Sequence, residues 1–200
     1  MSRELTLALI DAAAAAIAAH ADELTRLDQA IGDGDHGANL ACGFKAIAAE
    51  REKLADAPPG EALQKAGMLL VSQVGGASGP LYGSLLMAMG KALQAGQGPV
   101  DAFNEGVEAV KRRGKSDVGA KTMLDVLVPC AAALRVASPA TALVELRRAA
   151  VEGREATRPM KATRGRASFL GERSVGHVDP GAASSALLVE TVCDVLEKRA

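Results

Sequence analysis

Hydrophobic residues recur along most of the chain at spacings of three and four, the pattern of a helix that buries one face. Residues 4–20 show it first, with Leu5, Leu9, Ala13 and Ile17 on one face. Turn signals divide the remainder, and the pattern predicts further helices at residues 35–53, 61–74, 80–94, 100–112, 120–136, 139–157 and 181–198. Because no run of β-branched residues alternates in the manner of a strand, we expect an all-α fold.

The loops between these helices are mostly short, so sequence neighbours should pack antiparallel in a bundle. Loops are expected at 27–35 and 158–178, and the second is long enough to indicate a functional role. Asp35 and Asp179 each stand where a helix N-cap is expected, and Pro180 suits a first helical turn. Pro129 is expected to kink the helix at 120–136.

The composition excludes several classes of protein. The chain has 200 residues, of which 48% are hydrophobic and 24% charged, with a net charge of -1. These values suit one folded domain, residues 1–200, rather than a disordered chain. The near-neutral charge and the 2% aromatic content give no case for nucleic-acid binding. Alanine, the best helix former, makes up about a fifth of the residues and strengthens the helical prediction.

The sequence favours a cytoplasmic location for the protein. The first residues lack a basic start followed by an apolar run, so no secretory signal is expected. Residues 66–90 carry no charge, but the segment 75–80 in their middle would break a membrane-spanning helix, so no membrane partner is expected. Cys42, Cys130 and Cys193 are isolated, which fits small buried side chains better than disulfides or a zinc site.

The strongest chemical signal is the segment 27–39, Leu-Asp-Gln-Ala-Ile-Gly-Asp-Gly-Asp-His-Gly-Ala-Asn. Asp28, Asp33 and Asp35 lie within eight residues, and the glycines let the backbone fold tightly around them. Carboxylate oxygens select hard cations such as Mg²⁺ or Ca²⁺, and Mg²⁺ often completes its coordination with substrate phosphates. The alternative is an Asp-Gly turn with solvated side chains.

Two other loops suit an anionic ligand. Residues 75–80, Gly-Gly-Ala-Ser-Gly-Pro, allow close approach and lead into a helix N-terminus, which favours phosphate. The loop at 158–178 carries Arg164 and Arg166, whose guanidinium groups could clamp phosphate oxygens. The alternatives are a tight interhelical turn for residues 75–80 and a solvated basic loop for residues 158–178. A bundle can gather all three signals at one rim, as a nucleoside diphosphate bridged by Mg²⁺ would require, with Met123 as a candidate surface for the base.

Several blocks follow one another along nearly the whole chain. They are Asp28 with Gly-Asp-Gly-Asp-His-Gly at 32–37, Gly-Gly-Ala-Ser-Gly-Pro at 75–80, Arg-Gly-Lys at 113–115, Lys-Thr-Met at 121–123, Gly-Arg-Ala-Ser at 165–168, Gly-Glu-Arg-Ser at 171–174 and Asp-Pro-Gly at 179–181. In this order they resemble the nucleotide-binding L subunit of dihydroxyacetone kinase. The resemblance implies a single-domain, eight-helix antiparallel barrel with the nucleotide at one end.

The same resemblance implies a set of site residues. Asp28, Asp33 and Asp35 would hold two Mg²⁺ ions against the phosphates of ADP or ATP. The residues that would line the nucleotide are His36, Gly37, Ala38, Asn39, Ala77, Ser78, Gly114, Met123, Arg166, Asp179, Pro180 and Gly181. No side chain is expected to act as a nucleophile, because phosphoryl transfer needs positioning and charge neutralisation more than covalent catalysis.

Partners are also implied by the resemblance. In the family, dihydroxyacetone is bound by a separate K subunit through a covalent link to a histidine, and the L subunit supplies the phosphoryl group. We expect ADP to be a retained coenzyme that a phosphocarrier M subunit of the sugar phosphotransferase system rephosphorylates; a homodimer is left open. The alternatives are an ATP-exchanging kinase subunit for dihydroxyacetone or a related ketose, and a nucleotide-loaded regulatory module that binds a transcription factor.

Overall fold

Helices account for most of the structure, a computed structural model that describes residues 2–199. The α-helices in this range are α1 (Arg3–Ile31), α2 (His36–Ala49), α3 (Arg51–Asp56), α4 (Pro59–Gln73), α5 (Ser78–Gln94), α6 (Pro99–Gly114), α7 (Leu124–Val136), α8 (Ala142–Ala156) and α9 (Pro180–Glu197). A 3₁₀ helix, η1 (Arg166–Ser174), lies within the expected long loop. These residues contain no strand, so the all-α prediction is confirmed.

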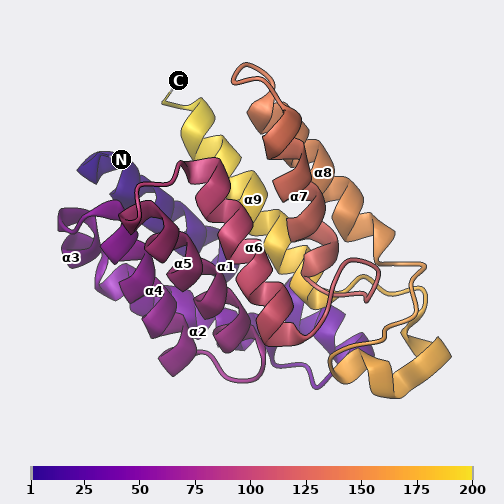
Figure 1. The fold of residues 1–200 in the computed structure, drawn as a ribbon. Coiled ribbons are helices and arrows are strands. Elements are labelled where there is room, and N and C mark those ends of the chain that lie inside the picture. The colour runs from indigo at the N-terminus through magenta and orange to yellow at the C-terminus, as the bar shows by residue number, and fades with distance from the viewer. Residues whose placement is uncertain (1, 200) are drawn as a thin grey trace.

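The helices form a closed antiparallel ring. α1 contacts α2, α2 contacts α4, and the contacts continue in order through α5, α6, α7 and α8 to α9, which packs back against α1. The short α3 lies outside this series, against α1 and α4. Figure 1 shows the first helices, in indigo, and the last, in yellow, within the same bundle. The eight long helices therefore make the expected barrel.

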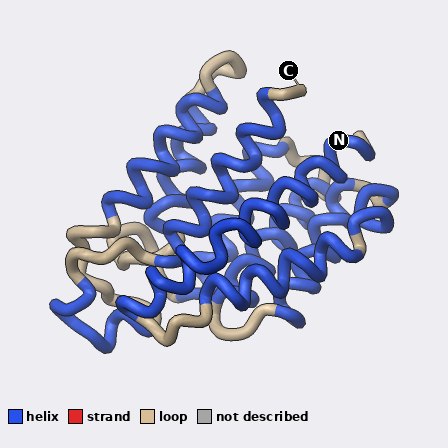
Figure 2. Tube along the Cα trace, turned by 180° about the vertical axis from the view of Figure 1, so that it is seen from behind, coloured by secondary structure: helices blue, strands red, loops and turns tan. Residues whose placement is uncertain are grey.

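Because the ring is antiparallel, its loops alternate between two ends. Both termini lie at one end, as Figures 1 and 2 show. The loops 32–35, 74–77, 115–123 and 157–179 gather at the opposite end, where η1 projects from the bundle. We call this the loop end; it brings together the three segments with chemical signals in the sequence.

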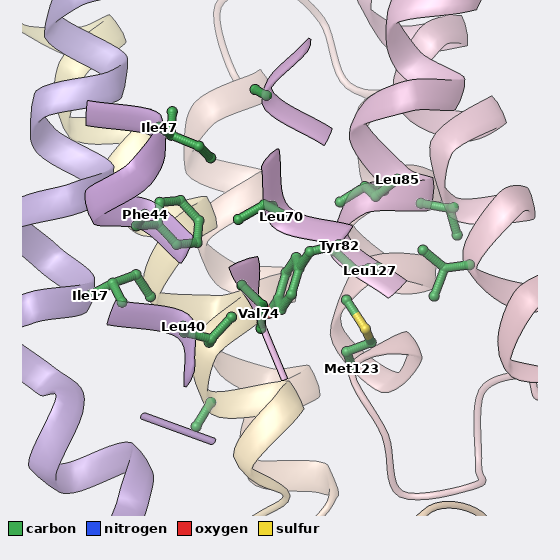
Figure 3. Packing of buried hydrophobic residues seen from close by; sticks show 14 of the residues in the cluster. Ile17, Leu40, Phe44, Ile47, Leu70, Val74, Tyr82, Leu85, Met123 and Leu127 are labelled. Atoms are coloured by element: carbon green, nitrogen blue, oxygen red, sulfur yellow. The ribbon is translucent and has the colours of Figure 1, made fainter. Parts of the chain in front are cut away.

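Aliphatic and aromatic side chains fill the interior of the barrel. Ile17 of α1, Leu40 of α2 and Leu70 of α4 are each 0% exposed. Figure 3 shows them facing the same interior as Tyr82 of α5 and Leu127 of α7. Each such side chain contributes about 1.5–3 kcal/mol when fully buried, so the shared core, more than helix propensity, keeps the ring closed.

Two pairs of glycines bring the backbones of α4 and α5 into contact. A Cβ on Gly60 would lie 2.6 Å from the carbonyl oxygen of Gly90, and a Cβ on Gly90 would lie still closer to that of Gly60. Gly67 and Gly83 face each other in the same way, at 2.8 Å in both directions. A side chain at any of these positions would force the two helices apart.

The first helix is longer than its sequence pattern predicted. α1 continues to Ile31, so the loop expected at 27–35 begins only at Gly32. Leu24, Asp28 and Ile31 are buried at helical spacing and extend the inward face of the helix. Asp28 therefore projects from a helix rather than from a loop.

By length and composition, α1 could cross a membrane, alone among the helices described for residues 2–199. The uncharged stretch at 66–90 does not form one long helix, because it is divided between α4 and α5. In the structure α1 is a wall of the ring, in contact with α2, α3 and α9. Its Asp11 pairs with Arg51 of α3 at 2.7 Å.

Two other helix boundaries were predicted wrongly. The helix expected at 35–53 is interrupted at Glu50, which separates α2 from α3. The helix expected from residue 139 begins at Ala142, after a turn in which the hydroxyls of Ser138 and Thr141 lie 3.0 Å apart. α7 runs through Pro129, and the expected kink there stays a prediction.

The start of α7 also differs from the expected residue 120. α7 begins at Leu124, because the Asp125 carboxylate accepts hydrogen bonds from the backbone amides of Gly119 at 2.5 Å and Thr122 at 2.7 Å. These bonds fold the preceding residues into turns. The amides of Gly119 and Thr122 thus donate to a side chain instead of to helical carbonyl groups, and the helix begins later than expected.

Replacing Gly90 by alanine should destabilise the protein, although alanine is the better helix former. The added methyl would meet the Gly60 carbonyl, so we expect the free energy of unfolding to fall by about 1–3 kcal/mol. Urea unfolding followed by circular dichroism measures this. Gly114→Ala is the matched control, because a Cβ there would lie 3.5 Å from the Leu81 side chain, an ordinary contact. Equal stability of the two variants would contradict the close packing.

Candidate functional site

Three carboxylates meet where α1 ends. Asp28 lies in the last turn of α1, and Asp33 and Asp35 lie in the turn that leads to α2. One oxygen from each lies within 4.8 Å of the others, and Gly34, at φ +76°, permits the tight turn. Oxygens bind Mg²⁺ at about 2.1 Å, so small side-chain rotations would bring all three onto one ion. These residues therefore fit a hard divalent cation.

Asp28 also has a structural role. It is 7% exposed, and its Oδ2 accepts hydrogen bonds from the backbone amides of Asp35 at 2.9 Å and His36 at 3.1 Å. Asp35 is the N-cap residue of α2, as predicted, but within residues 2–199 its side chain makes no capping bond, and the Asp28 carboxylate accepts the bonds instead. The other oxygen of Asp28, Oδ1, has room because Gly32 carries no side chain.

Four helices start around a cavity of about 170 Å³ beside these carboxylates. It is lined by His36, Ser78, Met123 and Pro180, which stand at the first residue or the N-cap of α2, α5, α7 and α9. Free amides and the partial positive charge of a helix start favour an anion. The cavity thus places carboxylates that fit a cation beside helix ends that fit phosphate.

His36 links three of these helix starts. Its Nδ1 lies 3.0 Å from Ser78 Oγ on α5, and its Nε2 lies 2.9 Å from Ser184 Oγ on α9. Ser184 Oγ also lies 2.8 Å from the hydroxyl of Tyr82. Burial lowers the pKa of His36 and raises the pKa of Tyr82 to about 12. Tyr82 and Ser184 were not predicted from the sequence, because only ring closure brings them to His36.

The long loop supplies the basic side of the cavity. Arg164 and Arg166 both line it, and Arg166 Nε lies 2.8 Å from Asp33 Oδ2. The side chains of Arg166 and Asp33 are 69% and 37% exposed, so their ion pair adds little stability. Its effect is to place a guanidinium group against the acidic cluster.

Asp179 fixes the start of α9. Its Oδ2 accepts a hydrogen bond from the Ala182 amide at 2.7 Å, and Pro180 occupies the first helical turn, so the predicted cap is confirmed. Asp179 is only 9% exposed. Burial raises the pKa of its carboxyl to about 7.

The cavity gathers most of the residues predicted for the site. Those that line it are Asp28, Asp33, Asp35, His36, Ala77, Ser78, Met123, Arg166, Asp179, Pro180 and Gly181. The acidic segment, the loop at 75–80 and the basic loop therefore meet in one place. Such an arrangement can hold an anionic ligand together with a divalent cation.

Gly37, Ala38, Asn39 and Gly114 were also predicted, but they do not line this cavity. Gly37 is buried against α1, where any side chain would meet the backbone, so its role in the structure is packing. Ala38 is exposed on α2. Asn39 lies beside the loop 74–77, where a Cβ on Gly75 would be 3.1 Å from its Oδ1. Gly114 ends α6, and contact of these four with a nucleotide stays a prediction.

Residues 30–194 match the family model described as the DAK2 domain. The chain belongs to the DAK2-domain family. A relative from Listeria innocua, named PEP-dependent dihydroxyacetone kinase 1, ADP-binding subunit DhaL, is 46% identical over 169 residues, 82% of each chain. The Escherichia coli K12 protein named PEP-dependent dihydroxyacetone kinase, ADP-binding subunit DhaL, is 41% identical over 177 residues, 84% of each chain. The resemblance of this DAK2 domain to L subunits is confirmed.

The DAK2 domain also resembles a solved structure, the dihydroxyacetone kinase from C. freundii in complex with AMP-PNP and Mg²⁺. The TM-score is 0.81 at 26% identity, and the match covers 97% of this chain. It covers only 34% of the C. freundii chain, so the DAK2 domain spans about a third of that protein. The likeness extends to nearly every helix of the ring.

The buried carboxyl of Asp179 predicts a pH effect on the stability of the DAK2 domain. Its pKa of about 7 in the folded protein lies above the value of an unfolded chain, ~3.9. The folded state therefore binds the extra proton, and stability is lost as pH rises from about 4 to about 7. Asp179→Asn keeps an acceptor oxygen for the cap but cannot ionise.

We expect Asp179→Asn to gain stability relative to the wild type across this pH range, by more than about 1 kcal/mol. Urea unfolding without metal or nucleotide measures the difference at each pH. Asp101→Asn, at an exposed position in the first turn of α6, is the control. A difference that stays constant from pH 4 to pH 8 would show that folding does not change the pKa of Asp179.

Proposed function

We propose that this chain is the ADP-binding L subunit of a dihydroxyacetone kinase, with residues 1–200 forming one nucleotide-binding domain. One observation carries the proposal: Asp28, Asp33 and Asp35 face four helix starts and Arg166 around the same cavity. A nucleoside diphosphate with bound Mg²⁺ has both the positive and the negative charge that this arrangement fits. The relatives named as ADP-binding subunits support ADP as the nucleotide.

Each wall of the cavity would then have its own task. Oδ1 of Asp28 and the carboxylates of Asp33 and Asp35 would hold two Mg²⁺ ions, which when bound neutralise phosphate charge during phosphoryl transfer. The starts of α2, α5 and α9 would orient the diphosphate. Met123 would offer its thioether side chain to the base. Arg166 would contact phosphoryl oxygens, as planar guanidinium groups do.

We further propose that a separate K subunit presents dihydroxyacetone at the loop end. ADP would stay bound as a coenzyme and be rephosphorylated in the cytoplasm by a phosphocarrier M subunit. The PEP-dependent relatives support a phosphocarrier rather than ATP as the donor. Both partners would have to approach the loop end, because the residues that would bind the cation and the phosphate groups lie there.

The nucleotide content of the purified protein tests this function. The protein is denatured and the released nucleotide is quantified by ion-exchange chromatography, before and after dialysis against EDTA. Near-stoichiometric ADP that leaves with EDTA would support a metal-held coenzyme. An empty protein that binds ATP reversibly would indicate an ATP-exchanging kinase subunit instead. Absence of any Mg²⁺-dependent nucleotide binding would overturn the proposal.

Asp33→Asn is the clearest variant of the metal site. The Asp33 carboxylate faces Arg166 and solvent, whereas that of Asp28 also caps α2. Loss of one charged ligand should weaken binding of ADP in Mg²⁺ roughly tenfold or more while helicity is unchanged. Isothermal titration calorimetry measures the affinity, and Asp22→Asn, at an exposed position on α1, is the control. Wild-type affinity in Asp33→Asn would refute the metal assignment.

Arg166→Ala should impair phosphoryl transfer more than folding. A charge-assisted contact to phosphate is worth about 1.5–3 kcal/mol, so turnover with the K and M subunits should fall roughly tenfold or more. The melting temperature should hardly change, because the ion pair with Asp33 is exposed. Arg173→Ala, on the same loop but outside the cavity lining, is the control. Equal turnover of the two variants would remove Arg166 from the site.

A further inference from the structure

The turn between α6 and α7 buries a lysine beneath the loop 158–178. Lys121 is 1% exposed, and its φ of +62° lies in the left-handed region, which is unfavourable for a residue other than glycine. Burying its ammonium group also removes hydration. Such costs persist only where surrounding contacts hold the residue in place. The function of Lys121 should therefore follow from what its Nζ contacts.

The ammonium group of Lys121 joins the two ends of the long loop. Nζ donates hydrogen bonds to the carbonyl oxygens of Thr157 at 2.8 Å, Met160 at 3.1 Å and His177 at 2.5 Å. The carbonyl of Arg158 lies further away, at 3.5 Å. Thr157 follows the last residue of α8, Met160 lies near the start of the loop, and His177 lies near its end, before α9. The three short bonds account for all three ammonium hydrogens.

Opposing effects act on the charge of Lys121. Burial lowers the pKa of its ammonium group, whereas the nearby carboxyl groups of Asp179 and Asp125 and the negative end of the α8 dipole favour the charged form. Asp125 also fixes the turn, since its carboxylate accepts bonds from the amides of Gly119 and Thr122 on either side of Lys121. The lysine is thus held at its backbone and at its amine.

Few apolar contacts hold the loop between its ends. Ala162 and Ala167 form a small cluster with Ile31, and Val178, at the C-terminal end of the loop, packs into the main core. Its two arms are joined by the Ala162 amide, which donates to Ser174 Oγ at 2.9 Å, and by further backbone bonds. Arg166 extends from this loop to Asp33 across the cavity. The position of Arg166 therefore depends on this small cluster together with the polar contacts at the base of the loop.

We propose that Lys121 is a positioning residue, which fixes the loop 158–178 and so holds Arg166 over the acidic cluster. This role rests on the proposed function where it concerns phosphoryl transfer, but the effect on the loop does not depend on a ligand. Because the carbonyls of Thr157, Met160 and His177 occupy its ammonium hydrogens, Lys121 acts on a bound nucleotide through Arg166 rather than by contact.

Hydrogen exchange of the full chain without nucleotide tests the effect on the loop. Lys121→Met keeps the length of the side chain but removes all three donors. We expect backbone amides in residues 158–178, such as that of Gly176, to exchange roughly tenfold faster or more, with α4 and α5 unchanged. Lys91→Met, at an exposed lysine of α5, is the control. Exchange at the wild-type rate in the loop would overturn the proposal.

If Lys121→Met does not fold, Lys121→Gln takes its place. The amide of glutamine donates two hydrogen bonds but carries no charge, so loop exchange should still be faster than in the wild type. Circular dichroism confirms that each variant is folded before exchange is measured. Wild-type protection of the loop in folded Lys121→Gln would equally overturn the proposal.

A double-mutant cycle with Arg166→Ala tests the effect on the reaction. We expect Lys121→Met to lower kcat roughly tenfold in the wild-type background, measured with the K and M subunits, and to change it little in the Arg166→Ala background. An equal loss in both backgrounds would mean a general structural role and would overturn the proposal. If the wild type binds no nucleotide, the proposed function fails, but hydrogen exchange still decides whether Lys121 fixes the loop.

Discussion

An antiparallel ring of eight helices places four helix starts at each of its ends, and this constraint sets the chemistry of the loop end. α2, α5, α7 and α9 begin there, so their free amides surround one cavity. α1 ends at the same end of the ring, and its Asp28 lines the same cavity. Three neighbouring carboxylates repel one another, and the positive helix ends beside them offset part of that repulsion. The fold therefore prepares the site for ligands of both signs.

Features that depend on local rules could be predicted from the sequence. The spacing of apolar residues located the eight long helices, and Asp179 with Pro180 marked the start of α9 because capping involves only adjacent residues. Asp28, Asp33 and Asp35 lie within eight residues, so a short segment was enough to predict that they meet. The order of the sequence blocks identified the family, which linked the three loop signals to one site.

Features that go beyond these local patterns could not be predicted in this way. The capping of α2 by Asp28 requires α1 to run on to Ile31, beyond the point where its apolar pattern was clear. His36 meets Ser184 across 148 residues, a contact that no local rule contains. Lys121 adopts a left-handed turn, for which a lysine in the sequence gives no signal. Of these three features, the contact of His36 with Ser184 follows from closing the ring.

Ring closure between α1 and α9 also sets the order of events during synthesis. A nascent chain leaves the ribosome N-terminal end first, at about 5–20 residues per second. Until α9 has emerged, α1 and α8 each lack a neighbour, and the cavity lacks the wall that contains Asp179 and Pro180. The hydrogen bond between His36 and Ser184 likewise cannot form until α9 has emerged. The cavity is therefore complete only after translation of the last helix of the ring. A ligand that contacts all of its walls can bind only after that point.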